Sequence, residues 1–256
     1  MVYYPYQDNI YGQSAIMMQT KAFEYESQHS TPWHKHELGQ LYWLSQGIFV
    51  IETECAQWTV TPGSIGWFPA GLDHRAWVPR KVKGNSLYLK PSDCIQYPSQ
   101  AGIYGGNSFI LAMLERVLRN NHVSSKDYQN SLLKLLGYEI SQCAELPLQL
   151  TLPLDRRARN VANELLRNPA CILDQSQLAN QWGISVRNLS RLFSQQTGLS
   201  FSQWRQQAKV VASLQWVLAG LPISEVASLS GYSNVSAYIE VFRQRFGKTP
   251  GQFKED

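Results

Sequence analysis

The strongest constraint on the fold is a sequence unit that occurs twice in the C-terminal part of the chain. In both copies an alanine, a glycine and a serine precede a hydrophobic pair, a second glycine, a glutamine and an aromatic residue. The first copy has Ala179, Gly183, Ser185, Leu192, Phe193, Gly198, Gln203 and Trp204, and the second has Ala227, Gly231, Ser233, Val241, Phe242, Gly247, Gln252 and Phe253. A repeated unit of this size predicts two similar structural modules.

Each copy has the pattern of a helix-turn-helix unit. Short helices are expected over residues 177–182 and 224–229, each followed by a glycine that permits positive φ, a serine able to cap, and a second helix. Apolar residues spaced as on one helical face predict a longer amphipathic helix from Phe201 to Leu218, ending at Gly220. This helix would hold the two units at a fixed separation.

The charge distribution favours a polyanionic partner for the same region. The net charge of the chain is +4, and it divides into −1 over residues 1–150 and +5 over residues 151–256. Double-stranded DNA is the polyanion that a helix-turn-helix unit binds.

The repeat region, over about residues 155–253, resembles the AraC/XylS family of transcriptional regulators. The resemblance is carried by Leu178-Ala179, Gly183-Ile184-Ser185, Leu189-Ser190-Arg191-Leu192-Phe193, Gly198, Ile223-Ser224-Glu225-Val226-Ala227, Gly231-Tyr232-Ser233, Phe242 and Phe246-Gly247-Lys248-Thr249-Pro250. It implies that two recognition helices enter successive major-groove segments on one face of DNA.

The resemblance also implies which side chains meet DNA. In the first unit Arg187, Ser190 and Arg191 would face base edges, where an arginine fork suits guanine. Ser236, Ile239 and Glu240 are the equivalent positions of the second unit, and the acidic Glu240 stands where the family often has a basic residue. Expected phosphate contacts are Arg205, Arg243, Lys248 and the amides at the Ser185 and Ser233 helix starts.

The N-terminal half has a different texture. Short apolar runs broken by Gly and Pro from residue 17 to about residue 92 predict an all-β barrel or sandwich, and helical spacing predicts two helices between residues 107 and 142. Pro147 and Pro153 mark a linker. The expected domains are therefore 1–147, for sensing and dimerisation, and 152–256, for DNA binding.

The strand-rich region resembles both cupin signatures. The first matches as His34-x-His36, then Gln40 in place of the usual Glu, then Gly47; the second matches as Gly63, Pro69-x-Gly71 and His74, with Val78 in place of the usual Asn. His34 and His36 share one face of a strand, so both imidazoles can enter a barrel and meet His74.

Three interpretations of this cluster remain open. His34, His36, His74 and the Gln40 amide oxygen are candidate ligands for Zn, Ni, Fe or Mn. The same residues are alternatively direct hydrogen-bonding partners of a small effector, or a polar part of the core. Candidate effector contacts are the surrounding tryptophans Trp33, Trp43, Trp67 and Trp77.

The expected fold class is α+β, with a cupin-like barrel and helical pair before an all-α domain of two helix-turn-helix units. The expected function is sequence-specific transcriptional control by a small effector or metal, most simply as an activator that works with RNA polymerase. The alternatives are a cupin metalloenzyme with an appended DNA-binding domain, and a constitutive regulator whose barrel only dimerises. The missing Glu and the complete DNA-binding pattern argue against the enzyme.

Surplus Leu and Ile residues between residues 107 and 142 favour a homodimer, or else cover the barrel. No apolar run approaches the ~20 residues of a membrane span. Met1–Pro5 lacks the basic-then-apolar plan of a signal peptide, so a cytoplasmic protein without a membrane partner is expected.

Overall fold

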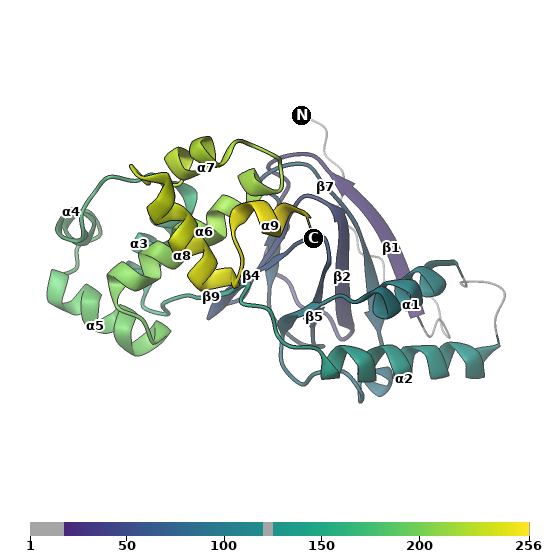
Figure 1. Cartoon of the computed structure of the whole chain (residues 1–256). Coiled ribbons are helices and arrows are strands. Elements are labelled where there is room, and N and C mark those ends of the chain that lie inside the picture. The colour runs from purple at the N-terminus through teal and green to yellow at the C-terminus, as the bar shows by residue number, and fades with distance from the viewer. Residues whose placement is uncertain (1–17, 120–124, 256) are drawn as a thin grey trace.

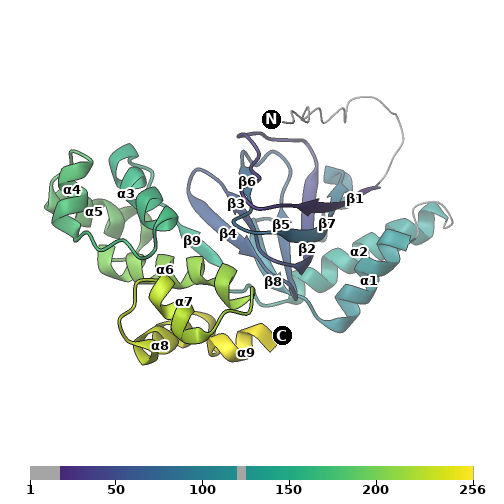
Figure 2. The same cartoon turned by 90° about the horizontal axis from the view of Figure 1, so that it is seen from above.

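The computed structural model describes residues 18–119 and 125–255. In this range the chain forms two β-sheets, a helical pair on one side of them and a helical C-terminal half on the other (Figures 1 and 2). The expected α+β class is confirmed. None of the described helices is long and apolar enough to cross a membrane.

The two sheets are antiparallel. One has the strand order β1-β7-β2-β5-β8 and the other has the order β6-β3-β4-β9. The strands are Met18–Tyr25 (β1), Gly39–Gln46 (β2), Phe49–Glu52 (β3), Ala56–Val60 (β4), Ser64–Phe68 (β5), Arg75–Trp77 (β6), Val82–Leu89 (β7), Gly102–Gly105 (β8) and Gln149–Thr151 (β9). Closure of these sheets into a cupin-like barrel stays a prediction.

The helices fall into two groups. The pair consists of α1 (Ser108–Arg119) and α2 (Lys126–Gln142), in the segment where two helices were expected. The C-terminal half contains α3 (Arg156–Arg167), α4 (Gln175–Gln181), α5 (Val186–Thr197), α6 (Phe201–Val217), α7 (Ile223–Leu229), α8 (Val235–Phe246) and α9 (Pro250–Glu255). Sequence analysis did not single out α3 and α9 as helices.

Strand periodicity divides the apolar residues of β2 between two cores. Leu41 and Trp43 belong to a cluster shared with α1 and α2, whereas Tyr42 and Leu44 belong to the interior between the sheets. Successive side chains of a strand point to opposite faces, so a strand buried on both sides is apolar almost throughout. The helical pair therefore covers the outer face of the first sheet.

The sheets and the C-terminal half share apolar contacts. The interior cluster that contains Phe49 and Phe68 continues through Leu148 to residues of α6, α8 and α9, including Leu214 and Phe246. A second cluster belongs to α3, α4, α5 and the first part of α6. The second helix-turn-helix unit thus shares a core with the sheets, while the first unit has its own.

Two strands lie outside the range expected for the barrel. β8 adds to the edge of the first sheet, and β9 pairs with β4 through Ala56–Thr151, Gln57–Leu150 and Trp58–Gln149. The segment between the two expected domains is therefore a sheet strand and not a free linker. Residues 1–17, which include the start of the expected barrel and the segment tested for a signal peptide, lie outside the described residues.

Candidate DNA-binding face and histidine centre

The first helix-turn-helix unit has the local signals that its sequence predicts. Asp174 and Gln177 form a capping box at the start of α4. Gly183 has φ 63° in the turn, and Ser185 caps α5 by accepting a hydrogen bond from the Asn188 amide. A residue with a β-carbon would be strained at that φ. The turn between the two helices is therefore fixed by its sequence.

The outer face of α5 carries two exposed arginines and no acidic residue. Leu189, Leu192 and Phe193 are buried on the opposite face. Arg187 and Arg191 are exposed. This face has the charge expected of a helix that approaches phosphates and base edges.

Arg191 is held in place along the helix surface. Its Nη2 donates to Asn188 Oδ1 at 2.8 Å, and its Nη1 donates to Gln195 Oε1 at 2.6 Å. Ser190 is tied to the preceding helix, because its Oγ accepts a hydrogen bond from Gln175 Nε2 at 2.7 Å. The three expected base contacts of the first unit therefore lie on one helix, with Arg191 oriented before DNA arrives.

The second unit repeats this plan with a different cap. Gly231 has φ 73°. Ser233 does not cap α8; Asn234 does, accepting hydrogen bonds from the amides of Ser236 and Ala237. The expectation for Ser233 was wrong because the helix starts one residue later and an asparagine, an equally good cap, occupies that position.

The outer face of α8 is less cationic than that of α5. Glu240 Oε2 accepts from Arg243 Nη2 at 3.2 Å, and Glu240 Oε1 accepts from Gln244 Nε2 at 3.0 Å. Ser236 is exposed, whereas Ile239 is partly buried against the shared core. Two expected DNA contacts of this unit, Glu240 and Arg243, thus neutralise each other in the absence of DNA.

Two other expected phosphate contacts have intramolecular partners. Arg205 donates to the Leu173 carbonyl at 2.7 Å and also to the Cys171 carbonyl. The Lys248 ammonium lies 5.5 Å from the centre of the Phe253 ring. Arg205 therefore fixes the segment before α4, and its phosphate contact stays a prediction, as does that of Lys248.

Sequence analysis missed Lys209, which joins α6 to the second unit. Its ammonium donates to the Gly231 carbonyl at 2.9 Å and lies 5.1 Å from the centre of the Tyr232 ring. Burial and the positive charge of Arg205 lower the pKa of Lys209. The available signal was a lysine placed directly between two apolar residues, Ala208 and Val210, of the long helix.

The structure brings the three cupin-motif histidines together. The ligand atoms of His34, His36 and His74 all lie within 4.8 Å of one another. His34 and His74 face each other across a bridge in which each amide donates to the carbonyl of the other at 2.9 Å. A backbone pair thus places two of the imidazoles side by side.

Each imidazole of this histidine centre is anchored through Nδ1. The contacts are His34 Nδ1 to Pro32 O at 2.9 Å, His36 Nδ1 to Leu38 O at 2.7 Å and His74 Nδ1 to Leu72 O at 2.8 Å. A carbonyl only accepts, so each of these Nδ1 atoms carries a proton, which in the neutral ring leaves Nε2 unprotonated. Nε2 then carries the lone pair, and carbonyl anchoring of this kind orients histidine ligands in metal sites.

Gln40 lies beside the histidines as the motif predicts. It is buried, and its Oε1 is 2.9 Å from His36 Nε2. When the His36 ring is neutral with its proton on Nδ1, both atoms are lone-pair acceptors. Either the amide is turned so that its NH2 donates to Nε2, or the two atoms are neighbouring ligands of one cation, whose bonds of about 2.1 Å separate adjacent ligands by roughly 3 Å.

His74 is the buried member of the centre. Burial, the largest cause, lowers the pKa of His74 to about 4, and its hydrogen bond to Leu72 acts in the opposite direction. His74 Nε2 is buried and has no hydrogen-bond partner among the described residues. A neutral, unsatisfied imidazole nitrogen directed at two other histidines fits a metal ligand.

The structure corrects the placement of two of the tryptophans. Trp43 and Trp67 are buried in the cluster under α1 and α2, and Trp67 Nε1 donates to the Pro98 carbonyl at 2.7 Å. They lie on the opposite face of the first sheet from Gln40, because odd and even positions of β2 point to opposite sides. Trp43 and Trp67 therefore lie away from the histidine centre.

The other two tryptophans lie at the second sheet. Trp33 is 45% exposed, and its ring lies 5.3 Å from the Arg75 guanidinium. Trp77 lines a cleft of about 540 Å³ between the second sheet and helices α3 and α6. An effector contact of Trp33 or Trp77 stays a prediction.

The comparisons with known proteins agree with this geometry. A family described as "Helix-turn-helix domain" matches residues 178–256. The chain is 28% identical to the "HTH-type transcriptional regulator NimR" of Escherichia coli (strain K12) over 224 residues, which cover 88% of this chain and 82% of that protein. It is 38% identical over 102 residues to the "HTH-type transcriptional regulator RipA" of Corynebacterium glutamicum, covering 40% of this chain and 31% of that protein.

Two solved structures are reported among those similar to this chain. The DNA-binding domain of AdpA in complex with a target DNA is 25% identical, with a TM-score of 0.36, and covers 39% of this chain and 90% of that one. Unsaturated fatty acid bound ToxT from Vibrio cholerae is 11% identical, with a TM-score of 0.39, and covers 95% of this chain and 96% of that one.

A doubled helix-turn-helix fold, with one relative that aligns over most of both chains, defines a DNA-binding transcriptional regulator and not an enzyme. The C-terminal half is an AraC-type DNA-binding domain. Over most of its length the chain is similar to a named HTH-type transcriptional regulator.

Arg191 and Arg205 should differ in what their loss does. Arg191→Ala removes an oriented, exposed guanidinium. The difference in binding free energy between the operator and a scrambled duplex should therefore decrease by ~1–3 kcal/mol. Arg205→Ala leaves two carbonyls without their donor and should lower the free energy of unfolding by about 1–3 kcal/mol. Binding titrations on both duplexes, with urea unfolding of both variants, check this; equal losses on the two duplexes for Arg191→Ala would contradict the assignment.

The buried His74 predicts a pH-dependent stability. The folded state keeps His74 neutral down to about pH 4, while the unfolded state takes a proton below its ordinary pKa of 6.5. The contribution of His74 to the free energy of unfolding should therefore be fully present above pH 6.5. It should decrease by up to about 3 kcal/mol as the pH drops towards 4. Urea unfolding in the presence of a chelator measures this, and His74→Gln should have a flatter profile; identical profiles would show that His74 is not the titrating group.

Proposed function

We propose that the affinity of this regulator for its operator DNA depends on a divalent transition metal bound by the histidine centre. The observation that carries the proposal is the anchoring of three Nδ1 atoms to carbonyls with the ligand atoms within 4.8 Å. His34, His36 and His74 would hold the ion through Nε2, and the Gln40 amide oxygen would complete the set. Imidazole-rich sites suit Zn, Ni or Fe, and Mn where oxygen ligands are added.

The ligand set also favours an effector class. Three neutral imidazoles and one amide would leave the full charge of the ion uncompensated. An ion held in this way attracts an anionic ligand to any open position. A small organic anion bound to the ion is therefore the effector that this site would take most readily.

A second function for the same residues rests on the 2.9 Å contact between His36 and Gln40. With the amide turned, this contact is an ordinary hydrogen bond, and the centre is a metal-free polar site that binds an effector directly. Metal content separates the two. In both cases the protein would act in the cytoplasm, and as an activator it would contact RNA polymerase; one relative, from Rhodococcus, is described as "Transcriptional activator NphR".

The test compares metal content and operator affinity in the full chain. Protein stripped with a chelator and dialysed against Zn, Ni, Fe(II) or Mn should bind about one ion per chain, and the ion should change operator affinity. His36→Ala should lose the ion and the response but keep basal DNA binding.

His29→Ala is the matched control. His29 stacks on Tyr25 at 4.1 Å between ring centres and lies outside the histidine centre. This variant should keep both the ion and the response. Metal-free wild-type protein that still responds to an effector would favour the second function, and a normal response in His36→Ala would contradict both.

The dimer also belongs to this proposal, with the outer face of α1 and α2 as the contact. Phe109, Leu135 and Tyr138 are 50%, 43% and 52% exposed on these helices. Exposed apolar side chains gathered on one helical pair are typical of a contact between identical subunits. Sedimentation equilibrium should give a dimer for the wild type and a monomer for Leu135→Glu with Tyr138→Glu; a monomeric wild type would refute this surface.

A further inference from the structure

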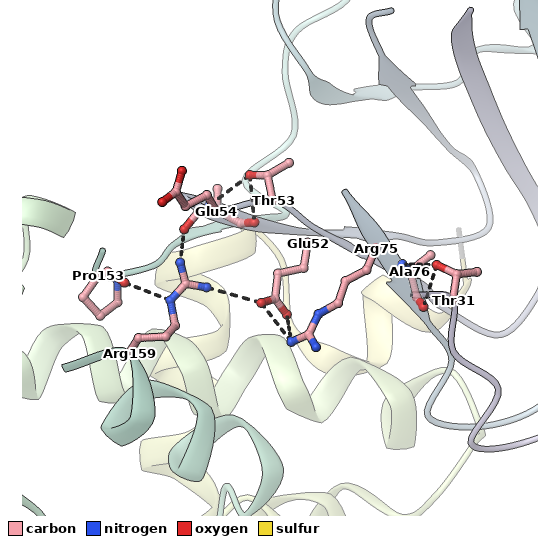
Figure 3. A network of polar contacts seen from close by, with 9 residues as sticks. Thr31, Glu52, Thr53, Glu54, Arg75, Ala76, Pro153 and Arg159 are labelled. Atoms are coloured by element: carbon pink, nitrogen blue, oxygen red, sulfur yellow. Dashed lines mark hydrogen bonds and ion pairs between the residues drawn. The ribbon is translucent and has the colours of Figure 1, made fainter. Parts of the chain in front are cut away.

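One buried carboxylate joins the second sheet to the DNA-binding half. Glu52, at the end of β3, is 4% exposed and accepts hydrogen bonds from Arg75 Nη2 through both oxygens at 3.0 Å. Arg159 Nη1 donates to Glu52 Oε1 at 3.3 Å (Figure 3). Arg75 lies opposite Glu52 in the β3–β6 register, whereas Arg159 comes from α3. We call these three residues the ion triad.

Arg159 uses its whole guanidinium at this joint. Its Nε donates to the Pro153 carbonyl at 2.8 Å, and its Nη2 donates to the Glu54 carbonyl (Figure 3). Only 16% of the side chain is exposed. α3 is therefore held against the β3–β4 turn by directional contacts, and a planar five-donor fork makes such contacts where a lysine would not.

α3 in turn positions the first recognition helix. Val161 and Leu165 of α3 are buried in one cluster with Leu189 and Phe193 of α5. Close-packed side chains transmit a displacement because they leave no room to absorb it. A shift of Arg159 on the sheet therefore moves the helix that carries Arg191.

The other end of the ion triad lies next to the histidine centre. Arg75 directly follows His74, and β6 begins at Arg75. Alternating side chains direct His74 to the centre and Arg75 to the opposite side, towards Glu52 and α3. A ligand that moves the His74 imidazole therefore displaces the backbone next to Arg75, a member of the triad.

We propose that the ion triad of Glu52, Arg75 and Arg159 is the joint through which the histidine centre controls the position of the first helix-turn-helix unit. Glu52 and Arg159 are positioning residues for DNA binding, since neither is part of the outer faces of α5 and α8. This inference rests on the proposed function of the histidines. The joint itself has a readout that requires no metal.

The first experiment measures the ratio of operator affinities with and without Zn in the full chain. Glu52→Gln keeps the side-chain size, removes the charge and leaves the histidines in place. In this variant the ratio of operator affinities should become about one, while the Zn content stays that of the wild type. Coupling is the factor by which one ligand changes the affinity for the other, and a ratio of one means that it is lost. Glu115→Gln, which breaks the 3.3 Å Glu115–Arg119 pair on α1, should keep the wild-type ratio. A wild-type ratio in Glu52→Gln would overturn the proposal.

The second experiment is calorimetry of the metal-free protein. The wild type should unfold in one transition, and Glu52→Gln, Arg159→Gln and the double variant should each show two, with the double variant no more uncoupled than either single one. Arg159→Lys, which keeps the charge and loses the fork, replaces Glu52→Gln in both experiments if that variant does not fold. A single transition in all variants would overturn the joint. A third outcome separates the two proposals. If Zn does not change the operator affinity of the wild type, but the variants still show two transitions where the wild type shows one, the proposed function of the histidines is wrong and the joint is supported.

Discussion

Burial of α6 is the constraint on which the arrangement of the molecule depends. Trp204 and Ala208, near its start, belong to the core of the first helix-turn-helix unit, while Leu214 and Val217 belong to the core that the second unit shares with the sheets. A helix that is apolar on several sides is stable only when each side has a partner. One end of α6 therefore carries the first unit, and the other end joins the second unit to the sheets.

Polar contacts make this packing directional. Trp204 Nε1 donates to the Thr151 carbonyl at 2.7 Å, which ties the start of α6 to β9. Ser213 Oγ and the Tyr238 hydroxyl share a buried hydrogen bond of 2.9 Å, which ties α6 to α8. Breaking a buried pair of this kind leaves an unsatisfied group at a cost of ~1–3 kcal/mol, so these bonds select one register of the helices. The separation of α5 and α8 follows from that register.

Local signals made much of the DNA-binding half predictable. The glycines at positive φ, the Ser185 cap and the apolar spacing of the helices act over a few residues, and the sequence displays them directly. The histidine centre was predictable from the spacing of its motif, although the expected strand through His34 and His36 is reduced to an isolated bridge between His34 and His74. The assignment of Trp43 failed although the alternation from Gln40 already placed it on the other face.

Contacts between distant segments could not be predicted from the sequence. Glu52 and Arg159 are separated by 107 positions, and nothing around either residue indicates the other. Arg205 has the type and position of a phosphate contact, and only the fold shows that carbonyls of the preceding segment occupy its donors. Such pairings follow from how the sheets and helices pack, which local propensity does not determine.

The central claim is that one chain presents α5 and α8 to the same face of DNA. Hydroxyl-radical footprinting of the full chain on an operator selected from random sequence tests it most directly. The account predicts that each bound subunit protects two segments about one helical turn, or roughly 34 Å, apart on one face of the duplex, with the stronger base selection under α5. A single protected segment, or two on opposite faces, would contradict it.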